Sequence, residues 1–251
     1  MKKLFVACAI AATLLSSPAI AADHCAALPT HEALKKALTD ARRADNGGFN
    51  LDMWATVVDR SGRVCAVVYT GETNDAQWPG SRVISAQKAN AANAFSLKGL
   101  ALSTANLYSA VQPGGSLFGL QESNPVDTDA AYDGNAADFG SPKDPMTGAR
   151  IGGVNVFGGG LALYNNAGEI IGGIGVSGDS SCADHNIAWR ARHALQLDYV
   201  AAGVSADKND NIVYDIDGGK SAGGFGHPTC GGKEKDILTT LPQSRKAADK
   251  N

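Results

Sequence analysis

The chain has 251 residues, with 22 lysines and arginines against 25 acidic residues, and a formal net charge of −3 at pH 7. This length suits one elaborated domain or two small ones, and it can bury a sizeable core. A weakly acidic chain lacks the basic surplus typical of proteins that bind nucleic acid or anionic membranes. Neither is therefore expected as a partner.

The first 21 residues have the pattern of a secretory signal peptide. Lys2 and Lys3 precede the apolar run 4–15, and residues 19–21 (Ala-Ile-Ala) supply a small-residue cleavage site. Cleavage would remove two lysines and no acidic residue, so the net charge would change from −3 to about −5. No later stretch approaches the roughly 20 apolar residues of a transmembrane helix. The sequence therefore predicts a soluble, exported protein that is periplasmic or secreted.

Hydrophobic periodicity and turn residues predict two hairpins, each followed by a helix. In chain order the predicted elements are a helix over 31–44, a hairpin with strands over 54–59 and 63–69, a helix over 81–96, a short helix over 103–111, a long loop, a second hairpin over 159–176, a helix over 181–195 and a strand candidate over 211–216. Hairpins that lead into helices imply an antiparallel sheet with helices on a face, which is an α+β design.

Two segments lack sustained periodicity. Residues 112–153 are rich in Gly, Pro, Asn and Asp, and an irregular segment of this length is typical of a lid, an oligomer contact or a folded excursion. Residues 231–251 are polar and rich in lysine, which predicts a flexible C-terminal tail. We therefore expect a single domain over 22–230, interrupted by a long insertion at about 112–153.

The second hairpin leads into a glycine-rich corner. Four glycines crowd its second strand and the turn after it: Gly172, Gly173, Gly175 and Gly178. Without a Cβ atom, these residues allow another backbone or a flat ligand to approach closely. The following helix presents free N–H groups here, so the corner is a candidate seat for a carboxylate or phosphate. The alternative is that the glycines let a helix pack closely on the sheet, and the sequence favours neither.

Four cysteines remain after removal of the signal peptide: Cys25, Cys65, Cys182 and Cys230. An even number in an oxidising compartment favours two disulfides, and the spacing matches neither a Cys-x-x-Cys redox motif nor a zinc site. Three pairings are possible. We favour Cys25–Cys65, which ties the N-terminal segment to an early strand, and Cys182–Cys230, which ties the C-terminal segment to the late helix.

Three polar side chains are candidates for a ligand site. His185 lies near the glycine corner and is a candidate axial ligand, since imidazole commonly holds haem iron; a surface histidine bonded to a loop is the alternative. Lys88 has small alanine neighbours that would let it reach a pocket or a carboxylate, although a solvent-facing lysine is the ordinary explanation. Arg82 begins the same helix, and it and Trp78 could contact the propionates and rings of a ligand.

Three blocks of sequence carry a family resemblance. They are 57–64 (VVDRSGRV), 85–92 (SAQKANAA) and, above all, 159–188. The chain resembles the GlcG/HbpS-type haem-binding proteins, which share a D-x-x-G hairpin, a K-A-x-x-A helix and a G-E-x-I-G-x-I-G-V-S-G block before a helix. The resemblance covers most of 51–197.

This resemblance implies a profilin-like α+β fold with a central antiparallel sheet flanked by helices, assembly into homo-oligomers and, for some members, binding of haem or a related tetrapyrrole. The chain departs from the family pattern at Asn90, where a threonine or arginine often stands, in the insertion over 112–153 and in the cysteine-bearing tail. The resemblance carries no axial ligand onto a position of this chain.

Three functional hypotheses follow. The first is an exported haem-binding or haem-sensing protein that holds a tetrapyrrole, or another small anionic ligand, between Gly175 and Gly178 of the corner and the helix that begins near Ser81. The second is an enzyme or enzyme accessory acting on a small organic acid or aldehyde, with Lys88, His185 and Asp184 as polar groups of its pocket. The third is a structural oligomer whose pocket is vestigial.

Overall fold

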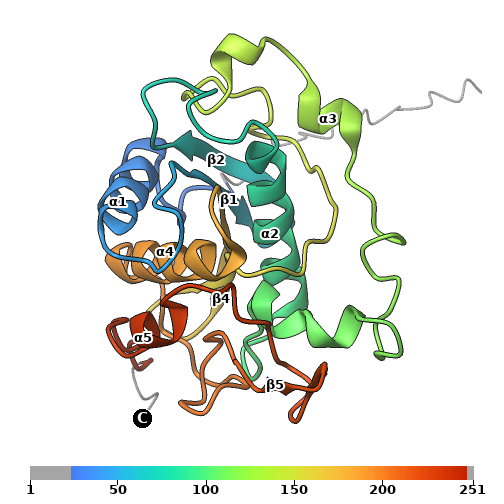
Figure 1. The fold of residues 1–251 in the computed structure, drawn as a ribbon. Helices are drawn as coiled ribbons and strands as arrows, with labels where there is room; N and C mark the ends of the chain where they lie inside the picture. Colours follow the sequence, from blue (N-terminus) through green and yellow to red (C-terminus); the bar gives the residue numbers. More distant parts are fainter. Residues whose placement is uncertain (1–23, 248–251) are drawn as a thin grey trace, which may run out of the picture.

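A four-stranded antiparallel sheet forms the centre of the molecule (Figure 1). The computed structural model describes residues 24–247. The strands are β1 (Trp54–Asp59), β2 (Val64–Tyr69), β3 (Gly160–Tyr164) and β4 (Ile170–Ser177), in the spatial order β2-β1-β4-β3. Each hairpin therefore contributes one central and one edge strand. This arrangement confirms the predicted α+β fold with an antiparallel sheet.

The described residues form the three long helices that the sequence predicted, over 31–44, 81–96 and 181–195, and two short helices that it did not predict. They are α1 (His31–Arg43), α2 (Ser81–Phe95), α3 (Thr128–Tyr132), α4 (Ser181–Ala194) and α5 (Glu234–Leu238). The short helix expected over 103–111 consists of two 3-10 turns, η1 (Thr104–Leu107) and η2 (Ser109–Val111), and a third turn, η3 (Ala136–Asp138), follows α3. A two-stranded hairpin of β5 (Ile216–Asp217) and β6 (Lys220–Ser221) replaces the strand candidate over 211–216.

Both faces of the sheet are covered. Alternate residues of a strand point to opposite faces, so Ala55 and Val57 of β1 pack with α1 and α4, whereas Trp54 and Val58 pack on the side of α2. All six residues of β1 are buried. The result is three layers, in which α1 and α4 lie side by side on one face and α2 crosses the other.

The insertion is a folded excursion that covers the α2 side of the sheet. In Figure 1 the insertion rises from near the lower end of α2 to α3, which lies above the start of α2. Three residues of the insertion, Ala131, Met146 and Ile151, are buried in the hydrophobic cluster that also contains Trp54 and Val83. Their burial removes apolar surface from water, which holds an irregular segment in place without long helices or strands.

The predicted flexible tail is wrong for most of its length. Helix α5 lies within it, and Ile237 and Leu241 are buried in the core beside α1 and α4. Arg245 then donates to Asp198 and to the carbonyl oxygen of His193, 2.8 Å away, at the end of α4. The lysines suggested a solvated segment, but the apolar residues between them bury against the domain.

Both favoured disulfides are present. Cys25 and Cys65 have Cα atoms 5.6 Å apart, and those of Cys182 and Cys230 lie 6.1 Å apart. The first bridge ties the N-terminal segment to β2, and the second ties the C-terminal segment to the first turn of α4.

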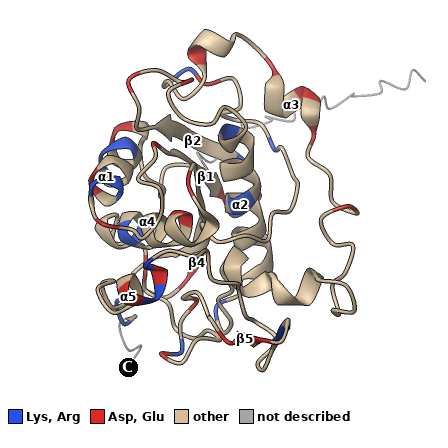
Figure 2. Cartoon of the chain, viewed as in Figure 1, with Lys and Arg blue, Asp and Glu red and all other residues tan. Residues whose placement is uncertain are grey.

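The predicted signal peptide, residues 1–21, lies outside the described residues. Within 24–247, no helix has the length and apolar character needed to cross a lipid bilayer. Figure 2 shows acidic and basic positions interspersed along the chain, with acidic residues at α3.

Candidate functional site

The glycine corner is filled by protein backbone. A Cβ atom on Gly175 would overlap the carbonyl oxygen of Ser85 in α2, and one on Gly173 would overlap that of Ala89. A Cβ atom on Gly178 would overlap the carbonyl oxygen of Asp52. Gly175 and Gly178 therefore let neighbouring backbone approach the end of β4, and they do not line a gap between the corner and α2. Of the two interpretations that the sequence left open, the structure adopts close packing.

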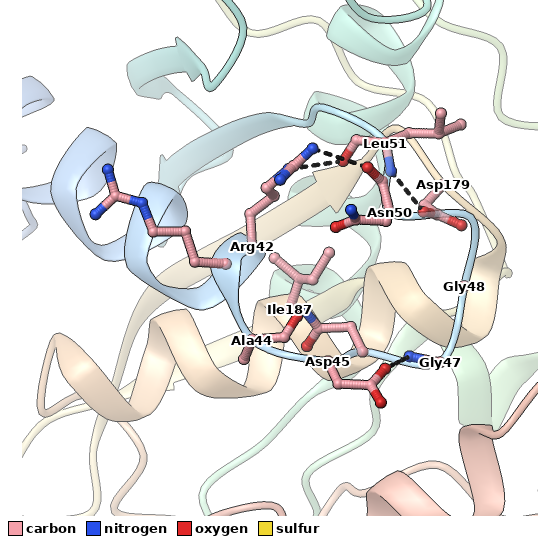
Figure 3. Close-up of a pocket in the computed structure, with 11 residues that line it drawn as sticks. Arg42, Ala44, Asp45, Gly47, Gly48, Asn50, Leu51, Asp179 and Ile187 are labelled. Atoms are coloured by element: carbon pink, nitrogen blue, oxygen red, sulfur yellow. Dashed lines mark hydrogen bonds between the residues drawn. The ribbon is translucent and has the colours of Figure 1, made fainter.

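The start of α4 holds a carboxylate that belongs to the protein. Asp179 Oδ1 accepts a hydrogen bond from the amide of Phe49 at 2.9 Å, and its Oδ2 accepts one from the amide of Leu51 at 3.0 Å. A pocket of about 340 Å³ adjoins this contact, and Figure 3 shows Arg42 on its wall bonded to the loop carbonyls of Asn50 and Leu51. Asp179 therefore fixes the loop between α1 and β1, while the first turn of α4 is capped by the Ser180 hydroxyl, which accepts from the amide of Ala183 at 3.3 Å.

Lys88 and Asp184 form a buried ion pair between α2 and α4. Lys88 Nζ lies 2.7 Å from Asp184 Oδ2 and 3.1 Å from the carbonyl oxygen of Val176, and each side chain is only 3% exposed. Burial raises the pKa of Asp184 to about 6, while the ammonium group of Lys88 opposes that rise. The lysine does reach a carboxylate, as one interpretation of the sequence expected, but the pair is enclosed by protein.

His185 is fully buried under the C-terminal segment. Its Nε2 lies 3.1 Å from Asn211 Oδ1 and accepts a hydrogen bond from the amide of Ile212 at 3.2 Å. Burial lowers the pKa of His185 to about 3, so the ring is neutral. Residues 211–212 contact Nε2, so a ligand could reach this nitrogen only if they moved away.

His227 lies close to the Cys182–Cys230 disulfide. Its Nε2 accepts from the amide of Gly158 at 3.3 Å, and its Nδ1 lies 2.7 Å from the carbonyl oxygen of Pro228. Burial lowers the pKa of His227 to about 4. The Cys182, Cys230 and His227 side chains together resemble a metal-binding cluster, but the two sulfur atoms are joined in the disulfide.

Arg82 holds the insertion against α2. Its Nε donates to Asp144 Oδ2 at 2.9 Å, its Nη2 donates to the other oxygen of that carboxylate, and its Nη1 donates to the carbonyl oxygen of Ala131 at 2.7 Å. The guanidinium carbon also lies 3.7 Å from the centre of the Phe139 ring. These contacts show that Arg82 is committed to the protein and is not a free cation for propionates.

The same contacts shape a cleft at the N-terminal end of α2, which we call the α2 cleft. Its volume is about 430 Å³, and its lining residues come from β1, α2, the loop before α2 and the insertion: Trp54, Asn74, Asp75, Pro79, Gly80, Arg82, Val83, Tyr132, Ala136 and Phe139. Aromatic and aliphatic side chains dominate these walls, as in sites for small organic ligands.

Trp54 lines the α2 cleft but is itself almost completely buried. Trp54 is 1% exposed, and its indole Nε1 has no partner among the described residues. A buried N–H without a partner is costly unless a ligand or water accepts from it. The α2 cleft thus combines apolar walls with a buried polar group that the described residues leave unpaired.

Sequence reasoning located only part of this cleft. It singled out Arg82 and the start of α2, but it missed Trp54, Tyr132 and Phe139. Trp54 had the pattern of an ordinary strand residue, and the other two lie in an aperiodic insertion where spacing gives no signal. Trp78, 53% exposed, immediately precedes the lining residue Pro79.

The family model described as haem degrading protein HbpS-like matches residues 30–193. The chain belongs to the HbpS-like family. The match confirms the resemblance carried by the hairpin and helix motifs, and it spans the sheet, α2, α4 and the insertion. Residues 194–247, which include the segment over His185, lie beyond it.

Solved structures with related folds have modest similarity to this HbpS-like chain. A PduOC–haem complex is 24% identical and covers 66% of this chain and 94% of its own, with a TM-score of 0.46. The Klebsiella pneumoniae protein ORFY, of family DUF336, is 25% identical. The match covers 66% of this chain and 89% of ORFY, with a TM-score of 0.44. A double mutant of Streptomyces reticuli HbpS is 16% identical. The match covers 77% of this chain and 99% of the HbpS chain, with a TM-score of 0.39. No curated protein shows significant sequence similarity to the chain.

Proposed function

We propose that this protein binds haem or a closely related tetrapyrrole, and that it does so in the α2 cleft. The observation that carries the proposal is the match to the HbpS-like family, described as haem-degrading, over 30–193. The cleft lies at the start of α2, which is one of the two elements between which the sequence-based hypothesis expected the ligand. Its other side comes from the insertion, since the glycine corner is closed by backbone.

The residues of the α2 cleft fit a flat, largely apolar molecule. Trp54, Val83 and Phe139 line the cleft with apolar side chains that a ring system can contact. When bound there, haem would supply a redox-active iron centre. The protein would supply the walls and partial exclusion of water.

Titration with haemin tests the proposal. A saturable shift of the Soret band in the wild-type protein, with intact disulfides, is the expected result. Gly80→Trp adds bulk at a residue that lines the cleft, and its Cβ atom would meet no neighbour within 4 Å. We expect it to weaken haemin binding at least tenfold, which corresponds to a loss of about 1.4 kcal/mol or more of binding free energy.

The matched control is Gly99→Trp. Its Cβ position is also free of neighbours within 4 Å, and Gly99 does not line the cleft. This variant should bind haemin like the wild type. Absence of a saturable shift in the wild type would refute haem binding, whereas equal binding by the two tryptophan variants would place the haem elsewhere.

We also propose that the protein is exported. Support comes from the signal-peptide pattern of residues 1–21 and from two disulfides, which persist in oxidising compartments. Protein recovered from the exported fraction should begin at Ala22. A mature chain that still begins at Met1 would contradict this. The predicted homo-oligomer is tested on the same sample by sedimentation velocity.

A further inference from the structure

The walls of the α2 cleft contain few side chains able to bind iron. Haem iron in proteins is commonly held by histidine, cysteine, methionine or tyrosine. Among the described residues that line the cleft, none is a histidine, a cysteine or a methionine, and Tyr132 is the one tyrosine. The cleft also includes the carboxylate of Asp75, but its Oδ1 accepts a 2.6 Å hydrogen bond from Thr73 at the exposed surface.

Tyr132 has a reachable hydroxyl group on a fixed backbone. The side chain is at the end of α3 and is 58% exposed, and its hydroxyl makes no hydrogen bond with the described residues. The preceding residue, Ala131, is fully buried and its carbonyl oxygen accepts from Arg82 of α2 at 2.7 Å. The insertion is therefore anchored next to the phenol, which limits the motion of the backbone that carries it.

The predicted iron ligand, His185, is placed very differently. It is 0% exposed, its Nε2 contacts Asn211 and Ile212, and it does not line the α2 cleft. Binding at His185 would require displacement of a segment that the Cys182–Cys230 disulfide restrains. Binding at Tyr132 requires no such rearrangement of the chain.

We infer that Tyr132 is the protein's iron ligand in the α2 cleft and binds ferric haem as a phenolate. This inference rests on the proposed function. In the binding step the phenol proton passes to solvent water, and the Tyr132 oxygen forms a bond to ferric iron in place of a water or chloride ligand. No change of oxidation state occurs.

Tyr132→Phe tests the inference, because it removes the oxygen and keeps the ring. With haemin, the wild type should show a phenolate-to-iron charge-transfer band and resonance Raman bands of a bound phenolate. Tyr132→Phe should lose both, and its affinity for haemin should fall at least tenfold. Affinity for metal-free protoporphyrin, measured by quenching of tryptophan fluorescence, should change less than twofold.

Two further variants complete the test. Tyr199→Phe removes a hydroxyl outside the cleft and should keep the wild-type spectrum. His185→Gln retains an acceptor for the Ile212 amide and should keep it as well.

Each opposite result has a distinct meaning. A Tyr132→Phe variant that keeps the phenolate bands, or that loses protoporphyrin and haemin binding equally, would overturn the assignment of Tyr132 as the iron ligand. Loss of iron ligation in His185→Gln with retention in Tyr132→Phe would transfer the role to His185. A wild type that binds neither haemin nor protoporphyrin would refute the proposed function itself, and the inference with it.

Discussion

Arg82 Nε lies 2.9 Å from Asp144 Oδ2, and this buried pair joins the first turn of α2 to the insertion. Neither side chain is more than 2% exposed. The pair connects two segments that the sequence separates by 62 residues, and its arginine lines the α2 cleft. A ligand site at this place therefore depends on an interaction that is itself structural.

Asp144→Asn should destabilise the protein strongly. The change leaves the Arg82 guanidinium buried without its charged partner, and loss of one member of a buried pair costs about 3–5 kcal/mol. The free energy of unfolding, measured by urea denaturation, checks this. The double variant Arg82→Met/Asp144→Leu removes both charges and should be more stable than Asp144→Asn alone. A loss below about 1 kcal/mol in Asp144→Asn would show that the pair does not anchor the insertion.

Gly175→Ala should destabilise the protein by about 3 kcal/mol. The added methyl group would overlap the backbone of α2 at Ser85, so the helix must move away from β4. Gly99→Ala is the matched control: nothing lies near its Cβ position, and the free energy of unfolding should stay within about 0.5 kcal/mol of the wild type. Equal stability of both variants would contradict the close packing of α2 on the sheet.

Removing the Cys182–Cys230 bridge should release the segment over His185. The cysteines are 48 residues apart, a loop for which chain entropy predicts a loss of about 4 kcal/mol. In Cys182→Ala/Cys230→Ala, hydrogen exchange should accelerate at two amides of the segment 211–227. The Ile212 amide donates to His185 Nε2, and the His227 amide donates to the carbonyl oxygen of Val213.

The matched control for that variant removes the other bridge. Cys25→Ala/Cys65→Ala opens a loop of 40 residues, so the loss of stability should be similar. Protection of the amides in the C-terminal segment should nevertheless survive. Equal exchange at Ile212 in the two variants would mean that global unfolding, and not local release, governs the segment.

Acid should destabilise the protein through its buried histidines. Burial lowers the pKa of His227 to about 4 and of His185 to about 3, so the unfolded chain takes up protons first as the pH falls below about 6.5. Each histidine then costs about 1.4 kcal/mol per pH unit until its folded pKa is reached. Asp184, with a pKa raised to about 6, acts in the opposite direction between about pH 6 and 4.

His227→Gln isolates one of these contributions. Between about pH 6 and 4.5, its loss of unfolding free energy should be about 2 kcal/mol smaller than that of the wild type. His24→Gln, at an exposed position, should match the wild-type slope. Urea denaturation at each pH gives the comparison, and parallel slopes for His227→Gln and the wild type would show that His227 titrates normally in the folded state.

Local patterns were sufficient for the four-stranded sheet and for helices α1, α2 and α4. Strand alternation around β1 and β2 and helical spacing in α2 and α4 are properties of short stretches, so the sequence predicted them within a few residues. The favoured disulfides were also correct, because each joins a terminal segment to an element that the pattern had already identified. The tail was predicted wrongly because burial of Ile237 and Leu241 depends on a surface formed by α1 and α4.

By itself, the sequence determined the α+β class, the antiparallel hairpins and the family, since these depend on periodicity and on contiguous motifs. Only the tertiary structure decided which of the candidate residues face a ligand. The backbone of α2 closes the glycine corner at Gly175, residues 211–212 cover His185, and the insertion brings Tyr132 and Phe139 to the start of α2. Each of these contacts joins segments far apart in the chain, and their meeting is set by burial of apolar surface and by pairing of buried charges, which no local pattern records.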